Sequence, residues 1–494
     1  MNAPNDLKFP PLQDPSLFRN QSYVNGEWIN ADSGTRFDID NPADGSIIAS
    51  VPNCGAAETR RAIEAAKAAL PAWRALTAKQ RAALLRRWFD LMLLNADDLA
   101  LILTTEQGKP LPEAKGEIMY GASFIEWFAE EGKRIYGDVI PPHMVDKRLI
   151  IIKQPIGVTA AITPWNFPNA MIARKVAPAL AAGCTMVIKP AEQTPLSALA
   201  MAELAHRAGI PKGVLNIVTG DASSSIMIGK ELCANPIVRK LSFTGSTEVG
   251  RILMRQCADT IKKLSLELGG NAPFIVFDDA DLDAAADGLM QSKYRNAGQT
   301  CVSANRIYVQ AAIYDAFAEK VKARMSSLKV GRGTDNGVNI GPLIDEQGLA
   351  KVEAHLADAI AKGAKVMCGG KRHALGGRFY EPTLLTDVPM SAKVSKEETF
   401  GPVAPLIKFD TEAEAVQLAN DSEFGLAAYF FARDVGRVFR VGEALESGMV
   451  GINTGIFSNE VAPFGGVKQS GLGREGSKYG IEDYLEIKYL CLNV

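Results

Sequence analysis

Residues 158–162 read VTAAI, and four further short runs repeat this strand-like pattern downstream: TMVI (185–188), VLNIV (214–218), KLSF (240–243) and KLSL (263–266). Helical patterns fill the intervals near residues 170–182, 196–208, 222–232 and 247–258. Short strands that alternate with helices at this spacing need right-handed crossover connections, which place the strands in parallel within a buried sheet. The stretch therefore predicts an α/β fold.

A second α/β unit is expected after the first. Its expected strands are Phe274–Phe277, Arg306–Val309, Lys365–Met367, Ala404–Phe409, Ala427–Phe431 and Met449–Ile452. Before the first unit, apolar residues recur at helical spacing between residues 63 and 133, and Gly108–Pro110 interrupts them. We interpret these helices as a scaffold, because no polar side chains converge on their apolar faces. Two α/β units in one chain suggest a cleft between them.

Two strand-like stretches, residues 148–153 and 483–492, belong to neither unit. Late strands without a following helix often lie at a sheet edge, where their unpaired backbone groups can add to a partner's sheet. We therefore expect a homo-oligomer, either a dimer or a tetramer.

The composition is typical of a globular protein that binds a small molecule. The chain has 494 residues, of which 47% are hydrophobic and 22% are charged, and these values exclude a disordered or collagen-like protein. Lys and Arg number 54 and Asp and Glu number 56, so the net charge is −2. This balance gives no long-range field that attracts a polyanion, and neither nucleic acid nor an acidic membrane is an expected partner.

Cysteine and histidine usage argues against disulfides and against a catalytic metal. The seven cysteines include no Cys-x-x-Cys pair, so we expect reduced thiols. The four histidines show no His-Glu-x-x-His spacing, so we expect no metal ligands. The amino terminus lacks a basic region followed by an apolar stretch, and no run of about 18 apolar residues occurs. We expect a cytoplasmic protein without a membrane anchor.

Cys301 and Glu267 are the candidate catalytic residues. A glycine and small polar residues precede Cys301 and leave room for a substrate to approach the sulfur. A buried, inert thiol is the commoner role of a single cysteine, and the local sequence leaves that alternative open. Glu267 ends a predicted strand at the carboxyl edge of the sheet, where such folds bind ligands. Desolvation there would raise the pKa of its carboxyl group and suit it to general base catalysis; a strand-end cap is the other possibility.

Three more segments end strands at that edge of the sheet. Asn166 lies in the loop Pro164–Pro168, where its side-chain amide is a preorganised donor for an oxyanion. Lys189 and Glu192 follow the next strand, within reach of ribose hydroxyls. Residues 245–250 open a helix whose amide groups and dipole can receive phosphate. Each signal is weak alone, and the glycine spacing in the helix-opening segment is not that of the usual dinucleotide fingerprint.

In combination these segments resemble the aldehyde dehydrogenase superfamily over nearly the whole chain. Residues 398–402 (ETFGP) and 463–471 (PFGGVKQSG) add to the resemblance. It implies a Rossmann-type parallel-sheet cofactor domain, an α/β catalytic domain and a β oligomerisation arm. The corresponding ranges are 1–132 and 156–266 for the dinucleotide-binding domain, 267–474 for the catalytic domain, and 133–155 with 475–494 for the arm.

The resemblance also implies a mechanism. Cys301, as a thiolate, attacks an aldehyde carbon to form a thiohemiacetal, while the Asn166 side chain and the Cys301 N–H hold the oxyanion. Hydride transfer to NAD or NADP leaves a thioester, and a water activated by Glu267 hydrolyses it to the acid. The residues that match the family's cofactor contacts are Thr163, Pro164, Trp165, Lys189, Glu192, Gly245, Ser246, Gly250, Glu398 and Phe400.

Within the superfamily, the chain resembles bacterial succinate-semialdehyde dehydrogenases, with glutarate-semialdehyde dehydrogenases close behind. Arg174, Arg295 and a weaker third contact, Ser458, match positions that bind the far carboxylate of the substrate. The guanidinium fork suits that task, and surface salt bridges are the alternative for the arginines. Glu192 stands where many NADP-dependent relatives have Ser. Because a carboxylate repels a ribose 2′-phosphate, we expect NAD to be preferred, with NADP as the other candidate.

Three other functions are weighed against this one. A CoA-acylating aldehyde dehydrogenase would transfer the acyl group to CoA, but the presence of Glu267 favours hydrolysis. A cysteine hydrolase or acyltransferase would need a histidine base, and the four histidines are not clustered. A catalytically silent binding protein would be expected to lack some of Asn166, Glu267 and Cys301.

Overall fold

The runs between residues 158 and 266 form the centre of an eight-stranded sheet in the computed structural model, which describes residues 9–494. Neighbouring strands in the order β9-β8-β7-β10-β11 are parallel, which confirms the predicted buried parallel sheet. These strands are β7 (Val158–Ile162), β8 (Thr185–Lys189), β9 (Leu215–Ile217), β10 (Val238–Thr244) and β11 (Lys263–Glu267). The crossover helices are α5 (Ala170–Ala182), α6 (Pro195–Arg207), α7 (Ala222–Ala234) and α8 (Thr247–Cys257).

Antiparallel strands extend this sheet at both edges. β1 (Ser22–Val24) and β2 (Glu27–Ile29) continue it beyond β9, and β21 (Gly471–Leu472) pairs with β11. A separate hairpin consists of β3 (Arg36–Asp40) and β4 (Ile47–Pro52). The four early strands escape prediction because their burial shows no regular two-residue alternation. The domain limits stay a prediction, and residues 1–8 of the first domain lie outside the described residues.

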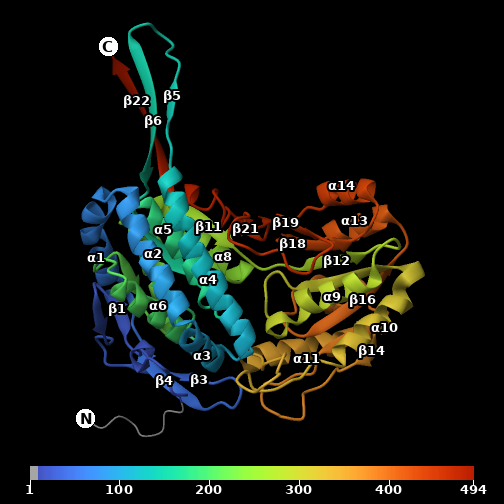
Figure 1. Cartoon of the computed structure of the whole chain (residues 1–494). Coiled ribbons are helices and arrows are strands. Elements are labelled where there is room, and N and C mark those ends of the chain that lie inside the picture. The colour runs from blue at the N-terminus through green and yellow to red at the C-terminus, as the bar shows by residue number, and fades with distance from the viewer. Residues whose placement is uncertain (1–8) are drawn as a thin grey trace.

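Four long helices pack on the first sheet and its crossover helices (Figure 1). They are α1 (Ala56–Ala75), α2 (Ala78–Leu94), α3 (Ala96–Gln107) and α4 (Leu111–Glu131). Their apolar faces bury Trp73, Trp88 and Phe124, as expected of a scaffold. Gly108 ends α3 in a left-handed conformation with φ of 92°. Among residues 9–494, no helix has both the length and the apolar character needed to cross a membrane.

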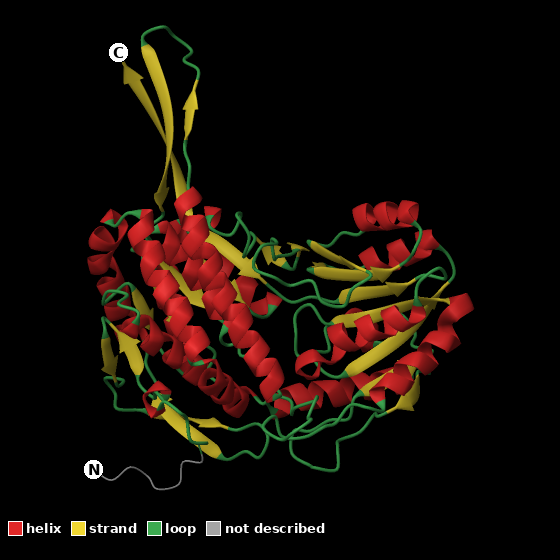
Figure 2. Cartoon of the chain, viewed as in Figure 1, coloured by secondary structure: helices red, strands yellow, loops and turns green. Residues whose placement is uncertain are grey.

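A second sheet of seven strands forms the other lobe (Figure 2). Its order is β14-β15-β16-β13-β12-β18-β19, and every neighbouring pair is parallel except β14 with β15. The strands are β12 (Ala272–Val276), β13 (Ala304–Gln310), β14 (Lys365–Cys368), β15 (Thr383–Thr386), β16 (Val403–Phe409), β18 (Ala427–Phe431) and β19 (Met449–Ile452). The strands expected here are confirmed, and the four-residue β15 is an addition.

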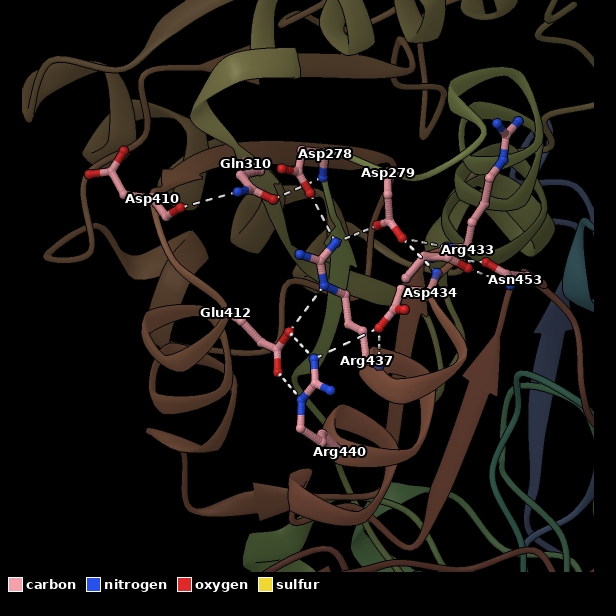
Figure 3. A network of polar contacts seen from close by, with 11 residues as sticks. Asp278, Asp279, Gln310, Asp410, Glu412, Arg433, Asp434, Arg437, Arg440 and Asn453 are labelled. Atoms are coloured by element: carbon pink, nitrogen blue, oxygen red, sulfur yellow. Dashed lines mark hydrogen bonds and ion pairs between the residues drawn. The ribbon is translucent and has the colours of Figure 1, made fainter.

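Helices flank this second sheet, and a charged network holds two of them in place (Figure 3). Arg437 pairs with Asp278 at 2.9 Å and with Glu412 at 3.1 Å, and its guanidinium carbon lies 4.7 Å from the centre of the Phe277 ring. The network therefore ties α13 and α14 to the segment that follows β12. The helices are α9 (Leu282–Tyr294), α10 (Tyr314–Met325), α11 (Glu346–Ala361), α12 (Lys393–Lys396), α13 (Glu412–Asn420) and α14 (Val435–Ala444).

A three-stranded arm projects from the first lobe (Figures 1 and 2). It consists of β5 (Asp138–Ile140), β6 (Lys147–Pro155) and β22 (Leu485–Asn493), and β22 pairs with β6 along its whole length. Both stretches that fit neither α/β unit are therefore confirmed as strands. The arm leaves large apolar side chains exposed, among them Val139, Val145, Ile487, Tyr489 and Leu492.

Candidate active site

The carboxyl ends of the parallel strands meet at one edge of the first sheet. Lys189 ends β8, Thr244 ends β10 and Glu267 ends β11. A cavity of about 450 Å³ opens there, and both α/β units contribute to its wall. Residues 164–167 come from the first unit and residues 299–302 from the second. The predicted cleft is therefore present.

Most of the residues predicted from the sequence line this cavity. They are Pro164, Trp165, Asn166, Arg174, Gly245, Ser246, Arg295, Cys301, Glu398, Phe400 and Ser458. Thr163, Lys189, Glu192, Gly250 and Glu267 lie outside the lining. Glu267 is nevertheless close to it, because its Oε2 accepts a hydrogen bond from Arg174 at 2.8 Å. The catalytic and binding roles of these residues stay predictions.

The segment before Cys301 is bent into a left-handed turn. Residues 296–298 have φ values of 51°, 55° and 77°, a conformation that non-glycine residues rarely adopt. At Gly298 a Cβ would lie 2.2 Å from a backbone oxygen of the neighbouring loop. The Gln299 side chain stabilises the turn. Its Nε2 donates to the Asn296 backbone carbonyl at 3.1 Å, and its Oε1 accepts the Ile344 N–H at 3.0 Å. These bonds fix Cys301 at the cavity wall.

The Cys301 residue is half-buried and lines the cavity, where a ligand could reach its sulfur. Burial raises the pKa of Cys301 well above its ordinary value; Glu267 adds to the rise and Arg174 opposes it. The thiol of the free protein is therefore protonated at neutral pH and needs a base. Glu267 is the carboxylate beside it.

Asn166 is buried and held from two sides. Its side-chain Nδ2 donates to the Gln299 backbone carbonyl at 3.1 Å. Its backbone carbonyl accepts from Lys109 at 2.8 Å and from the Asn296 side chain at 3.1 Å. Lys109 in turn forms a fully buried ion pair with Glu117 at 2.5 Å. One hydrogen of the Asn166 amide stays available, because the amide nitrogen carries two. The side chain is thus a preorganised donor at the cavity wall.

A buried chain of charges lies beside the cavity. Arg174 donates to Glu267 at 2.8 Å and also to Glu475; Lys175 donates to Glu475 and, at 2.6 Å, to the Thr244 hydroxyl. Burial raises the pKa of Glu267. Burial acts in the same direction on Glu475, but Lys175 and Arg174 outweigh it and lower that pKa. Burial thus makes Glu267 a stronger base than an exposed carboxylate, whereas Glu475 stays an anion.

Lys175 and Glu475, two members of this buried charge cluster, were not among the site residues expected from the sequence. Lys175 lies in α5, all of whose residues are buried, and a lysine in such an apolar helix is the signal that was available. Glu475 gives no comparable signal, because it lies in an irregular segment about 300 residues away.

Two arginines with donor nitrogens to spare line the same cavity. The Nη1 of Arg174 is buried and has no hydrogen-bond partner, although its other nitrogens bind carboxylates. Arg295 has no ion pair within the described chain, and its guanidinium carbon lies 5.4 Å from the centre of the Phe167 ring. Ser458 adds a hydroxyl to the lining. This set fits an anionic ligand group, although Arg174 has only one free nitrogen to offer.

The opposite side of the site fits a dinucleotide. Ser246 caps α8 by accepting the Val249 N–H at 3.3 Å, so the positive end of the helix lies at the cavity, where phosphate is stabilised. Glu398 accepts the Gly270 N–H at 3.2 Å and can accept ribose hydroxyls; burial raises its pKa to about 7. Outside the lining, Lys189 donates to Glu192 at 3.0 Å.

Gly250 has a packing role that the sequence does not reveal. A Cβ at Gly250 would lie 2.5 Å from the Leu268 side chain, so glycine lets α8 approach the segment after β11. The Trp165 and Phe400 rings, which come from opposite units, meet edge to face at 5.6 Å. The Trp165–Phe400 contact therefore joins the two units at this side of the cavity.

Further lining residues come from a helix that the sequence places only in the scaffold and from a second-unit helix that the sequence does not single out. Asp345, Gln347 and Lys351 belong to the start of α11, and Tyr120 belongs to α4. Asp345 caps α11 by accepting the Gly348 N–H at 2.8 Å. A capping residue can be recognised in a sequence, but it does not indicate whether that end of the helix faces a ligand site. Within residues 9–494, no three His, Cys, Asp or Glu side chains are placed to hold a metal ion.

Several known proteins resemble this chain over nearly its full length. Residues 28–490 match the aldehyde dehydrogenase family. The chain is 70% identical to the NADP(+) succinate-semialdehyde dehydrogenase of Escherichia coli, over 98% of this chain and 100% of that protein. It is also 70% identical to the glutarate-semialdehyde dehydrogenase of Pseudomonas aeruginosa, over 97% of this chain and 99% of that protein. The crystal structure of succinate-semialdehyde dehydrogenase from Burkholderia pseudomallei has a TM-score of 0.97 at 67% identity, and the match covers 98% of this chain and 100% of that one. The chain therefore belongs to the aldehyde dehydrogenase family.

Proposed function

We propose that the protein oxidises succinate semialdehyde to succinate, with NAD(P) as the hydride acceptor. The observation that carries this proposal is the lining of one cavity, where the Cys301 thiol lies with the Asn166 amide and two arginines, Arg174 and Arg295. The thiol and amide suit an aldehyde group, and the guanidinium groups suit a carboxylate at the far end of the same short molecule. The relatives named for succinate and glutarate semialdehydes support this substrate class.

Cys301 supplies the nucleophile in the proposed mechanism. Glu267, whose pKa is raised by burial, accepts the thiol proton, and the sulfur then attacks the aldehyde carbon. The free N–H of Asn166 and the Cys301 backbone N–H stabilise the negative oxygen of the thiohemiacetal. When bound, the nucleotide supplies the acceptor for the hydride. A thioester on Cys301 follows.

Glu267 acts again in the release of the acid. Glu267 first releases the thiol proton to solvent. Its regenerated carboxylate then takes a proton from water as the water oxygen attacks the thioester carbon, and the C–S bond breaks to free the Cys301 thiolate and the acid. The Arg174 hydrogen bond at 2.8 Å orients the Glu267 carboxylate, whose Oε1 has no hydrogen-bond partner and is available to the water. The presence of this base favours hydrolysis over transfer of the acyl group to CoA. Measuring the rate of NADH formation with and without CoA separates the two reactions, because only the acylating enzyme requires CoA.

Replacement of Arg295 by alanine tests the carboxylate-binding part of the proposal. We expect the KM for succinate semialdehyde to rise about 10- to 100-fold, because a charge-assisted hydrogen bond is lost. Butanal has the same carbon chain without the carboxylate, and its KM should change far less. Arg174 is a poorer target, since its removal would leave Glu267 buried without its cationic partner and would take one of two partners from Glu475.

A control for this test is Arg440→Ala, which removes an arginine whose side chain is 60% exposed, on α14. Its kinetics should match those of the parent protein for both aldehydes. Equal KM changes for the acidic and the neutral aldehyde in Arg295→Ala would contradict the carboxylate site.

Glutarate semialdehyde is the second candidate substrate. It is one methylene longer, and a methylene is worth only about 1–3 kcal/mol of discrimination in a binding pocket. The chain is 70% identical to relatives named for each of the two substrates. Comparing kcat/KM for the two semialdehydes decides which one is preferred.

NAD is the preferred nucleotide in this proposal. Glu192 is partly exposed and accepts a hydrogen bond from Lys189 at 3.0 Å, so the carboxylate partly neutralises the lysine that a 2′-phosphate would need. The E. coli relative is named for NADP(+), so the preference needs a direct test. We expect Glu192→Ser to raise kcat/KM for NADP about 10- to 100-fold, because a repulsive charge is removed. A parent protein that favours NADP would refute the preference.

The arm supports a homo-oligomer. Its side chains Val145 and Ile487 are 96% and 71% exposed, and β22 lies at the edge of its sheet. We expect light scattering to give a mass of two or four times 53.0 kDa and Ile487→Glu to lower it. Leu94→Glu, at an 80% exposed position on α2, is the control that should leave the mass unchanged. A monomeric parent protein would rule out this proposal.

A further inference from the structure

Tyr120 is a cavity residue that the mechanism above does not use. It lies on α4, and its side chain lines the cavity that contains Cys301, Arg174 and Arg295. Its Oη is buried beside the Arg174 guanidinium, which can only donate to it, and no described residue accepts its O–H. A buried O–H without an acceptor loses its hydrogen bond to water and gains none in return, so its presence at a ligand cavity points to a ligand atom as the missing acceptor.

The position of Tyr120 is fixed by close packing. At the adjacent Gly121, a Cβ would lie 2.1 Å from the Asn169 side-chain oxygen, so α4 approaches the start of α5 more closely than any other residue would allow. The Tyr120 ring also packs edge to face on Phe124 at 4.8 Å. The phenol is therefore preorganised, and little conformational entropy is lost when it binds.

The charges around the phenol define the ligand group. Burial raises the pKa of Tyr120, and the nearby Arg174 and Arg295 guanidinium groups oppose the rise. The phenol stays protonated at neutral pH and can donate. Arg174 has its own unpartnered buried nitrogen, Nη1, at the same cavity. The phenol O–H and the Arg174 Nη1, on adjacent helices and with a second arginine near them, offer donors that together favour an acceptor with negative charge.

We propose that Tyr120 is a specificity-determining residue whose phenol donates a hydrogen bond to the far carboxylate of the substrate, together with Arg174 Nη1 and Arg295. This inference rests on the proposed oxidation of an acidic semialdehyde and adds a third donor to its carboxylate site. A plain structural role for Tyr120 would use only its ring, which phenylalanine retains.

Tyr120→Phe is the direct test. We expect kcat/KM for succinate semialdehyde to fall about 10- to 100-fold, mainly through KM, because one hydrogen bond to a charged group is lost. The value for butanal should change far less. Tyr136→Phe, at a position 70% exposed and outside the cavity, is the matched control that removes a hydroxyl from the surface.

A binding measurement makes the test independent of turnover. Calorimetry with succinate on Cys301→Ala and on the double variant with Tyr120→Phe should show the same 10- to 100-fold weakening. Unchanged succinate affinity, or an equal loss of kcat/KM for both aldehydes, would overturn the role of Tyr120. If the parent protein itself does not prefer succinate semialdehyde over butanal, the proposed function fails. If the parent has that preference and Tyr120→Phe keeps it, only this inference fails.

Discussion

Cys301→Ser is expected to lower the rate of NADH formation roughly 10,000-fold or more, because the variant loses the one thiol that residues 9–494 place at the cavity wall. A serine hydroxyl has a far higher pKa than a thiol, and no histidine lines the cavity to deprotonate it. The substitution is nearly isosteric and leaves the turn at residues 296–298 intact. Stopped-flow absorbance with succinate semialdehyde and NAD should therefore show neither a burst nor a steady rate.

Cys368→Ser is the matched control for this prediction. Cys368 is also half-buried but does not line the cavity, and burial raises the pKa of its thiol as well. Its replacement should leave both the burst and the steady rate within about threefold of the parent values, as for most substitutions away from a site. Normal NADH formation in Cys301→Ser would remove Cys301 from the reaction.

Glu267→Gln is expected to separate the two halves of the reaction. The amide keeps the size of the side chain but cannot accept a proton, so the steady-state rate should fall about 1,000- to 10,000-fold while thioester accumulates. A burst of about one NADH per active site should remain, with a lower rate constant, since the thiol also loses its neighbouring base. Hydroxylamine, which attacks thioesters without a base from the protein, should restore part of the turnover.

The pH profile provides a second measurement for Glu267. Burial raises the pKa of its carboxyl group in the folded protein, and the carboxylate is the active form. The hydrolysis rate should therefore rise with pH through a range above the ordinary carboxyl pKa, and this limb should vanish in Glu267→Gln. Glu203→Gln is the control: Glu203 is 5% exposed and pairs with Arg19 and Arg207 outside the cavity. A variant that loses the burst amplitude together with the steady rate would show that Glu267 acts only before hydride transfer.

Most of the fold could be predicted because strand and helix patterns are local. The runs in 158–266 and the later series alternate with helical patterns, and the parallel strands of both sheets follow from that spacing. The aldehyde dehydrogenase fold expected from the resemblance is confirmed. The strands before residue 53 and β15 were missed, since each is three to six residues long and takes its place from its neighbours in the sheet.

The candidate site was predicted only in part. Strand ends indicate which polar side chains gather at the sheet edge, and on this basis Asn166 and Glu267 stand out. The sequence around Cys301 could not distinguish a nucleophile from an inert thiol, and only the resemblance favoured the former. Tyr120 and Lys175 escaped notice because their helices carry an apolar pattern that is explained by packing alone.

The sequence by itself determined the order of strands and helices and the residue types that end each strand, because burial periodicity and turn residues act over a few positions. Only the tertiary structure decided which of these side chains face one another. The thiol of Cys301 lies beside the carboxylate that ends a strand of the first sheet, and Arg174 is held by carboxylates that lie 93 and 301 residues further along the chain. Such contacts depend on how two lobes pack and exclude water, and that desolvation sets the proton affinities on which the proposed chemistry depends.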